Sequence, residues 1–210
     1  MNVPLHPSKI VCVGRNYIAH AAELGNEVPA EPLLFLKPPS ALVRSEDPIV
    51  IPPGVGRVDY EGEIGVLVGR RASHVAEDEA LEFVEGILPL NDVTARDLQR
   101  KDAQWSRAKG FDTFCPVGDP TPLAEVDMDG LSVITRLNGR EVQRGEVRQM
   151  VFSISFLVSY VSRIMTLEPG DLLATGTPEG IGPLAPGDLV EVEIPGVGVL
   201  GNPVVMGGEV

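Results

Sequence analysis

Residues 59–69 read Asp-Tyr-Glu-Gly-Glu-Ile-Gly-Val-Leu-Val-Gly, an acidic start that passes into an apolar run closed by glycine. Short runs rich in Val, Ile and Leu that end at Gly or Pro are typical of strands, so we expect a strand over Glu61–Val68. Side chains along a strand alternate between its faces, so Glu61 and Glu63 point the same way. Neither has an obvious basic neighbour on that face, and a cation bound between them would offset their repulsion. For an isolated E-x-E pattern, the alternative is a solvated strand face.

The same strand signature recurs at six further places: Lys9–Val13, Leu33–Leu36, Ile49–Ile51, Leu131–Leu137, Asp171–Ala174 and Leu189–Ile194. Three segments favour helix: Tyr17–Leu24, Glu77–Val84 and Ser153–Met165. Asn138-Gly139 predicts a two-residue hairpin turn. Because strands and helices do not alternate regularly, we expect a mixed α+β, β-rich fold with few short helices. The length suits a single domain over residues 1–210, with a short lead-in at 1–8.

The charge balance is strongly acidic, with 17 Lys and Arg against 30 Asp and Glu and a formal net charge of −13. Nucleic acids and anionic membrane surfaces need a basic face, so we expect neither as a partner. The two cysteines, Cys12 and Cys115, lie in apolar surroundings and have no zinc-type spacing, which predicts buried free thiols in a reducing compartment. The start of the chain lacks the pattern of a signal peptide, and no apolar run is long enough for a membrane span. These features predict a cytoplasmic protein.

A third carboxylate, Asp92, closes the apolar run Gly86–Asp92 and would stand at the end of a buried strand. The alternative is that Asp92 caps a helix over Val93–Arg100. For Asp97 we favour a structural role, because it forms a T-x-x-D capping box with Thr94. Three carboxylates without a neighbouring Cys or His describe an oxygen-only site. Such a site suits Mg²⁺ or Mn²⁺, with Ca²⁺ as a further option, and disfavours zinc.

His20 is the candidate general base. It precedes Glu23 by three residues, so a helix would place both side chains on one face. A carboxylate bonded to one imidazole nitrogen raises the basicity of the other nitrogen, which can then deprotonate water. A surface ion pair is the alternative. Residues 196–201 match G-x-G-x-x-G, but no helix or further βαβ unit follows them, so we interpret them as a β-turn region.

Five motifs in order resemble the fumarylacetoacetate hydrolase family: G-R-N-Y at 14–17, D-Y-E-x-E at 59–63, N-D-V-T-A-R-D-L-Q at 91–99, Q-W-x-R-A-K-G-F-D-T-F-C-P at 104–116 and T-G-T-P-E-G-I-G-P at 175–183. They are most similar to its acylpyruvase-like branch, which also contains oxaloacetate decarboxylases and isomerases of aromatic breakdown. The resemblance implies a mixed β-roll, a homodimer and a small 2-oxo acid as substrate. It also implies that Glu61, Glu63 and Asp92 are ligands of a divalent metal.

The resemblance further assigns His20 and Glu23 to the dyad that activates water, on a short helix that orders when substrate binds. It places Lys109 beside the metal and the substrate. Four more motif positions usually line the substrate pocket: Arg15, Tyr17, Gln99 and Thr177. The activity implied is metal-dependent hydrolysis of the C–C bond of acylpyruvates. The alternatives are isomerisation of 2-hydroxyhepta-2,4-diene-1,7-dioate or decarboxylation of oxaloacetate, and, from another class, a non-catalytic cation-binding protein.

Overall fold

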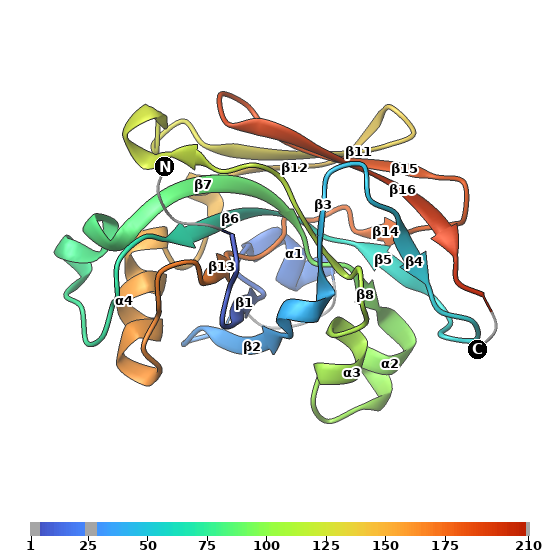
Figure 1. The fold of residues 1–210 in the computed structure, drawn as a ribbon, viewed down its shortest axis with the longest axis horizontal. Helices are drawn as coiled ribbons and strands as arrows, with labels where there is room; N and C mark the ends of the chain where they lie inside the picture. Colours follow the sequence, from blue (N-terminus) through green and yellow to red (C-terminus); the bar gives the residue numbers. More distant parts are fainter. Residues whose placement is uncertain (1–4, 24–28, 209–210) are drawn as a thin grey trace.

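The computed structural model describes residues 5–23 and 29–208, and strands dominate it (Figure 1). The largest sheet has eight strands, in the order β2-β1-β13-β6-β7-β9-β3 with β10 also paired to β7. Its strands are β1 (Ile10–Gly14), β2 (Leu33–Lys37), β3 (Leu42–Arg44), β6 (Gly62–Val68), β7 (Val84–Asn91), β9 (Cys115–Val117), β10 (Thr121–Pro122) and β13 (Leu172–Ala174). The fold is mixed and β-rich, as the strand signatures predicted.

A second sheet of five strands lies across β6 and β7 at the top of the view in Figure 1, in the order β12-β11-β15-β16-β4. Its strands are β4 (Ile49–Ile51), β11 (Ser132–Leu137), β12 (Arg140–Glu146), β15 (Leu189–Ile194) and β16 (Gly198–Met206). A small third sheet joins β14 (Gly182–Pro183), β5 (Val58–Tyr60) and β8 (Thr94–Ala95). Asn138 and Gly139 connect β11 to β12 with φ angles of 54° and 79°, the left-handed pair that a type I′ hairpin turn requires. The hairpin prediction is confirmed.

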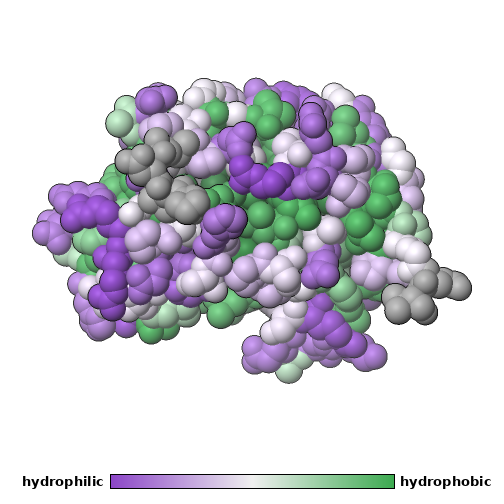
Figure 2. Space-filling view, viewed as in Figure 1, coloured by the Kyte–Doolittle hydropathy of each residue, from purple (hydrophilic) through white to green (hydrophobic). Residues whose placement is uncertain are grey.

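Helices are few and short. The α-helices are α1 (Ile18–Glu23), α2 (Arg96–Lys101), α3 (Ser106–Lys109) and α4 (Ile154–Ile164), and the 3₁₀ helices are η1 (Pro39–Ala41), η2 (Glu77–Phe83), η3 (Leu123–Glu125) and η4 (Val147–Gln149). Figure 2 shows hydrophilic residues gathered over α2 and α3 at the lower right of the molecule. The inner side of this pair instead contributes Arg96 and Lys109 to the interior, where both are buried.

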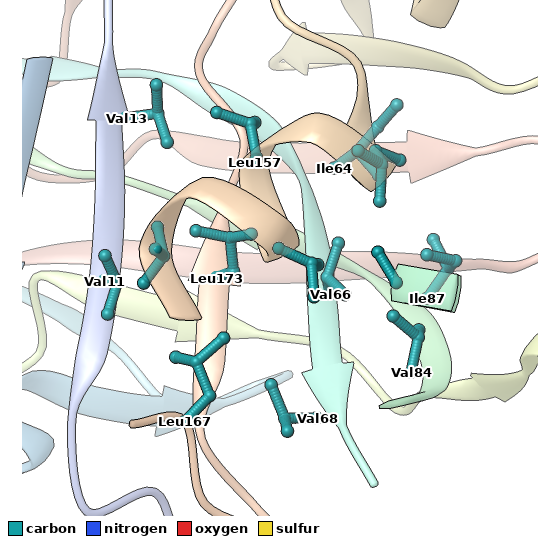
Figure 3. Close-up of a cluster of buried hydrophobic side chains, with 14 of the residues drawn as sticks. Val11, Val13, Ile64, Val66, Val68, Val84, Ile87, Leu157, Leu167 and Leu173 are labelled. Carbon is teal, nitrogen blue, oxygen red and sulfur yellow. The ribbon is translucent and has the colours of Figure 1, made fainter. Parts of the chain in front are cut away.

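The main core lies on the eight-stranded sheet, where α4 and residues of β11, β15 and β16 cover it. Ser153 begins α4 by accepting a hydrogen bond from the Phe156 amide at 3.1 Å, which satisfies one of the free donors at the helix start. The apolar face of α4 then packs against β1, β6 and β13, and Figure 3 shows Leu157 among Val13, Val66 and Leu173. The helical spacing in Ser153–Met165 predicted this face with Ile164 as its last residue, but Ile164 is 56% exposed.

Three local predictions need correction. Residues 77–83 form the 3₁₀ helix η2, and Val84 already belongs to β7. Thr94 and Ala95 form β8 because their backbone pairs with β5, so the helix begins only at Arg96. Asp92 is therefore not a helix cap, and the capping box predicted for Thr94 and Asp97 is wrong. The Thr94 hydroxyl instead donates to the Asp92 carbonyl at 2.9 Å.

Other local predictions agree with the structure fully or in part. Residues 196–201 contain a turn closed by the Val197 amide on the Ile194 carbonyl at 2.9 Å, but strand β16 begins within them at Gly198. Cys12 and Cys115 are free and buried, as predicted. The short helix predicted at Tyr17–Leu24 corresponds to α1, with Leu24 outside the described residues. Among the described residues, no helix has the length and apolar character needed to cross a membrane.

Candidate metal centre

The pairing of β6 with β7 brings the carboxylates of Glu61 and Asp92 to the same end of the sheet. The two strands are antiparallel with Gly62 opposite Asn91, so the residues just outside this pair, Glu61 and Asp92, also face each other. The Asp92 amide donates to the Glu61 carbonyl at 2.8 Å, and the Asn91 side chain accepts the Glu61 amide at 2.9 Å. These backbone contacts hold both acids at the same end of the sheet, so their side chains start from fixed positions.

Glu63 completes a cluster of three buried acids. One carboxylate oxygen from each of Glu61, Glu63 and Asp92 lies within 4.8 Å of the other two. All three residues are at least 95% buried, so water cannot screen their mutual repulsion well. Alternation along the strand thus predicted the side on which Glu61 and Glu63 meet, and the end of β7 supplies the third acid.

Three cations approach two of these acids. Lys109 donates to Glu61 at 2.8 Å and to Asp92 at 2.5 Å, and Lys37 donates to the other Asp92 oxygen at 2.6 Å. Arg96 donates to the second Glu61 oxygen at 2.6 Å. The expectation that no basic residue would lie near the Glu pair was therefore wrong for Glu61. Burial opposes ionisation of Glu61, but Lys109 and Arg96 together hold its pKa well below the usual range.

Sequence reasoning missed Lys37 and Arg96. Their partners lie 55 and 35 residues away along the chain, so no local spacing reveals the pairs. Lys37 does carry one signal: it ends the apolar strand β2 just before two prolines, and it is almost fully buried. An unpaired lysine is rarely buried, so a lysine at that place predicts a carboxylate partner.

Glu63 forms no ion pair among the described residues, although the charge of Lys109 acts on it from farther away. Its carboxylate accepts one hydrogen bond, from the Gly176 amide at 2.7 Å. Burial and the charges of Asp92 and Glu61 raise the pKa of Glu63 well above its ordinary value. A divalent metal between the three acids would supply the missing positive charge, and hard oxygen ligands suit Mg²⁺ or Mn²⁺. The residues present therefore fit the metal that the resemblance implies.

Gly176 makes this contact possible because of its backbone. Its φ of 101° lies in the left-handed region that glycine adopts readily, and a Cβ there would stand 2.8 Å from the Cβ of Asn16. Any other residue would therefore be strained, and it would also push against the loop after β1. The glycine keeps its amide directed at Glu63.

A cavity of about 380 Å³ opens over the three acids, a size that suits a small ligand. His20 and Lys109 line it, and the His20 Nδ1 lies 3.3 Å from the Glu23 carboxylate. A second Glu23 oxygen accepts the Gly180 amide at 3.1 Å, which fixes the carboxylate from the far side. The structure thus places the histidine, the lysine and the acid cluster on one cavity.

The predicted substrate-contacting residues divide into two groups. Arg15, Gln99 and Thr177 line the cavity, whereas the Tyr17 side chain is buried and is absent from the lining. The Tyr17 hydroxyl has no hydrogen-bond partner among the described residues. The Thr177 hydroxyl donates to the Gly62 carbonyl at 2.9 Å, so toward a ligand it can only accept. The structure also places Phe35 and Trp105 on the lining, which sequence reasoning left without a role.

Comparisons with known proteins identify the family of this chain. A family model described as fumarylacetoacetate hydrolase C-terminal matches residues 9–205. The chain is 40% identical to the mitochondrial oxaloacetate decarboxylase of Dictyostelium discoideum, covering 90% of this chain and 89% of that protein.

Two solved structures share the fold. The 5-carboxymethyl-2-hydroxymuconate delta-isomerase of Mycobacterium smegmatis is 43% identical with a TM-score of 0.91, covering 99% of this chain and 82% of that one. The fumarylpyruvate hydrolase of Pseudomonas aeruginosa, in complex with Mn²⁺ and pyruvate, is 32% identical with a TM-score of 0.91, covering 98% and 91%. With one continuous family match over nearly all of its length and these relatives, the chain belongs to the fumarylacetoacetate hydrolase family.

Proposed function

We propose that this enzyme hydrolyses the C–C bond of acylpyruvates or related 2,4-dioxo acids, with Mg²⁺ or Mn²⁺ held by Glu61, Glu63 and Asp92. One observation carries the proposal: His20, whose Nδ1 lies 3.3 Å from the Glu23 carboxylate, lines the same cavity as the acid cluster. A structural cation site needs no such pair. A hydrolase needs a base that can reach water beside the substrate. The Pseudomonas aeruginosa relative, solved with Mn²⁺ and pyruvate, supports both the metal and a 2-oxo acid ligand.

The metal site, His20 and Lys109 have separate roles in the proposed reaction. The metal, when bound, supplies Lewis-acid polarisation of the 2-oxo group. His20, with Nδ1 directed at Glu23, takes a proton from water through its other ring nitrogen. The water oxygen attacks the 4-oxo carbon, the C3–C4 bond breaks, and its electron pair remains on C3. Protonation at C3 then gives pyruvate and a carboxylic acid. Lys109 holds a positive charge beside the acids and can donate a hydrogen bond to the developing oxyanion.

A second candidate is decarboxylation of oxaloacetate or isomerisation of a related unsaturated diacid. The names of the Dictyostelium discoideum and Mycobacterium smegmatis relatives favour it. These reactions use the same enolate chemistry but need no attacking water. The two candidates therefore differ in their need for the His20–Glu23 pair.

The test is His20→Ala, assayed with Mg²⁺ against acetylpyruvate and oxaloacetate. A general base is typically worth about 10²–10⁴-fold, so acetylpyruvate hydrolysis should fall by that factor while oxaloacetate decarboxylation falls less. Metal affinity should not change, because His20 is not among the proposed ligands. His74→Ala is the matched control, since His74 is exposed and contacts Ser73. Undiminished hydrolysis in His20→Ala would favour the second candidate, and equal loss of both reactions would make His20 a substrate-positioning residue.

A further inference from the structure

One side of the cavity is aromatic. Phe35 comes from β2 and Trp105 directly precedes α3, and their rings meet edge to face with centroids 5.3 Å apart. Both rings line the cavity, and we refer to them together as the aromatic wall. An edge-to-face pair of this kind is a favourable arrangement, so each ring helps to hold the other in place.

Gly14 leaves the space that the Trp105 indole occupies. A Cβ at this position would lie 3.3 Å from Cζ3 of Trp105 and 3.4 Å from a methyl group of Leu33. The indole therefore packs closely against the backbone at the end of β1, and even one added methyl group would press on it. A ring held between Phe35 and a strand backbone can offer a well-defined surface to a ligand.

The aromatic wall begins where the charged site ends. The Lys109 ammonium lies 4.8 Å from the centroid of the Phe35 ring while it also binds Glu61 and Asp92. The acid cluster therefore contacts Lys109, Lys109 contacts Phe35, and Phe35 contacts Trp105, so the aromatic wall extends away from the acid cluster. A ligand whose charged head sits at the acid cluster can extend its other end along this line. Gln99 and Arg100 also line the cavity and contribute polar groups, so only part of the lining is aromatic.

We propose that the aromatic wall makes this enzyme selective for 2-oxo acids whose distal end, the acyl side beyond C3, carries a planar aryl or conjugated group. The inference rests on the proposed function, because it places the 2-oxo acid head at the acid cluster. Stacking on Trp105 and Phe35 stabilises a flat π system and contributes little to a short saturated chain. Trp105 and Phe35 are thus specificity-determining residues, and Gly14 preserves the space that Trp105 occupies.

The test uses two ligands that the hydrolase cannot cleave, because neither has a 4-oxo group: 2-oxo-4-phenylbutanoate and 2-oxopentanoate. Both are titrated by calorimetry in the presence of Mg²⁺ into the wild-type protein and into Trp105→Ala. Since Trp105 is the only tryptophan in the chain, its fluorescence in the wild type reports directly on contact with the phenyl group. An aromatic pair contributes about 0.5–1.5 kcal/mol, so Trp105→Ala should weaken the phenyl compound by roughly 2- to 12-fold relative to 2-oxopentanoate.

Two more variants make the result decisive. Gly14→Ala should lower the ratio of the affinity for 2-oxo-4-phenylbutanoate to the affinity for 2-oxopentanoate while the indole is still present. This variant serves as the test if Trp105→Ala does not fold. Leu36→Ala is the control, because Leu36 lies on β2 next to Phe35 but is 47% exposed and does not line the cavity. An unchanged ratio in both Trp105→Ala and Gly14→Ala, or an equal change in Leu36→Ala, overturns the inference and leaves the proposed function standing. If the wild type binds neither compound, the proposed function itself fails.

Discussion

Replacing Asp92 or Glu63 by its amide should have very unequal effects on the stability of the metal-free protein. Both side chains belong to the acid cluster, and Asp92→Asn and Glu63→Gln each remove one negative charge with little change of shape. Asp92 binds two buried ammonium groups, those of Lys37 and Lys109. Glu63 accepts one amide hydrogen and forms no ion pair among the described residues. The two substitutions therefore leave different partners behind.

The magnitude follows from the group that loses its partner. In Asp92→Asn, Lys109 keeps Glu61 as its counter-ion, but Lys37 loses its charged partner and keeps only neutral acceptors, the Val93 carbonyl at 3.1 Å and the asparagine oxygen. Removing one partner of a buried ion pair costs about 3–5 kcal/mol. We expect about 3 kcal/mol here, because the asparagine oxygen can still accept from Lys37. Glu63→Gln should cost less than about 0.5 kcal/mol or stabilise the fold, because the charges that raise the pKa of Glu63 no longer act on it.

Urea unfolding in a chelating buffer measures both effects, and a repeat with saturating Mg²⁺ adds a second readout. A ligand at 100 times its Kd stabilises the folded state by about 2.7 kcal/mol, a gain that the wild type should show and both variants should largely lose. Equal destabilisation of the two variants without metal would refute the assignment of counter-ions. A full Mg²⁺ response in either variant would remove that residue from the metal site.

Three further changes test other parts of the structure. Lys37→Met should raise the Kd for Mg²⁺ by about 10- to 100-fold in calorimetry, because an outer partner of the Asp92 ligand is lost; an unchanged Kd would contradict this. Leu157→Ala should lower the free energy of unfolding by about 2–5 kcal/mol in urea, since this core side chain is fully buried. The pKa of Asp171 is lowered although burial opposes this, because Asp171 accepts hydrogen bonds from the backbone and from Lys9. Its contribution to stability should thus be present above its ordinary pKa and disappear as the pH falls below about 4, and Asp171→Asn should abolish that part of the pH dependence.

The part of the fold that depends on local pattern could be predicted from the sequence. Helical spacing predicted α4 and its buried face except at Ile164, and Asn138-Gly139 predicted the turn between β11 and β12. Strand alternation predicted that Glu61 and Glu63 face one side. The errors lie where a distant segment decides the local structure. Residues 94–95 form a strand because β5 pairs with them, and nothing in their own sequence requires it.

In the candidate site too, local sequence patterns revealed some residues and not others. The acids could be found because they sit at the start and end of recognisable strands, and the His20–Glu23 spacing is local. Lys37 and Arg96 could not be assigned, because their partners become neighbours only when β2, α2 and β7 are in place. The same holds for Phe35 and Trp105, whose rings meet across 70 residues of chain. Polar pairing and aromatic contacts of this range depend on the whole topology rather than on any one element.

The ion pairs at the metal centre have a consequence for how ligands bind. Four buried acids share the centre with three buried bases, and the groups are Asp59, Glu61, Glu63, Asp92, Lys37, Arg96 and Lys109. With all of them ionised their formal charges sum to −1, so a divalent cation alone leaves the interior with an excess of one positive charge. An anionic ligand, such as oxalate or the enolate of a 2-oxo acid, offsets this excess. Mg²⁺ and a dianion should therefore bind with positive heterotropic cooperativity, each raising the affinity of the other by the same factor.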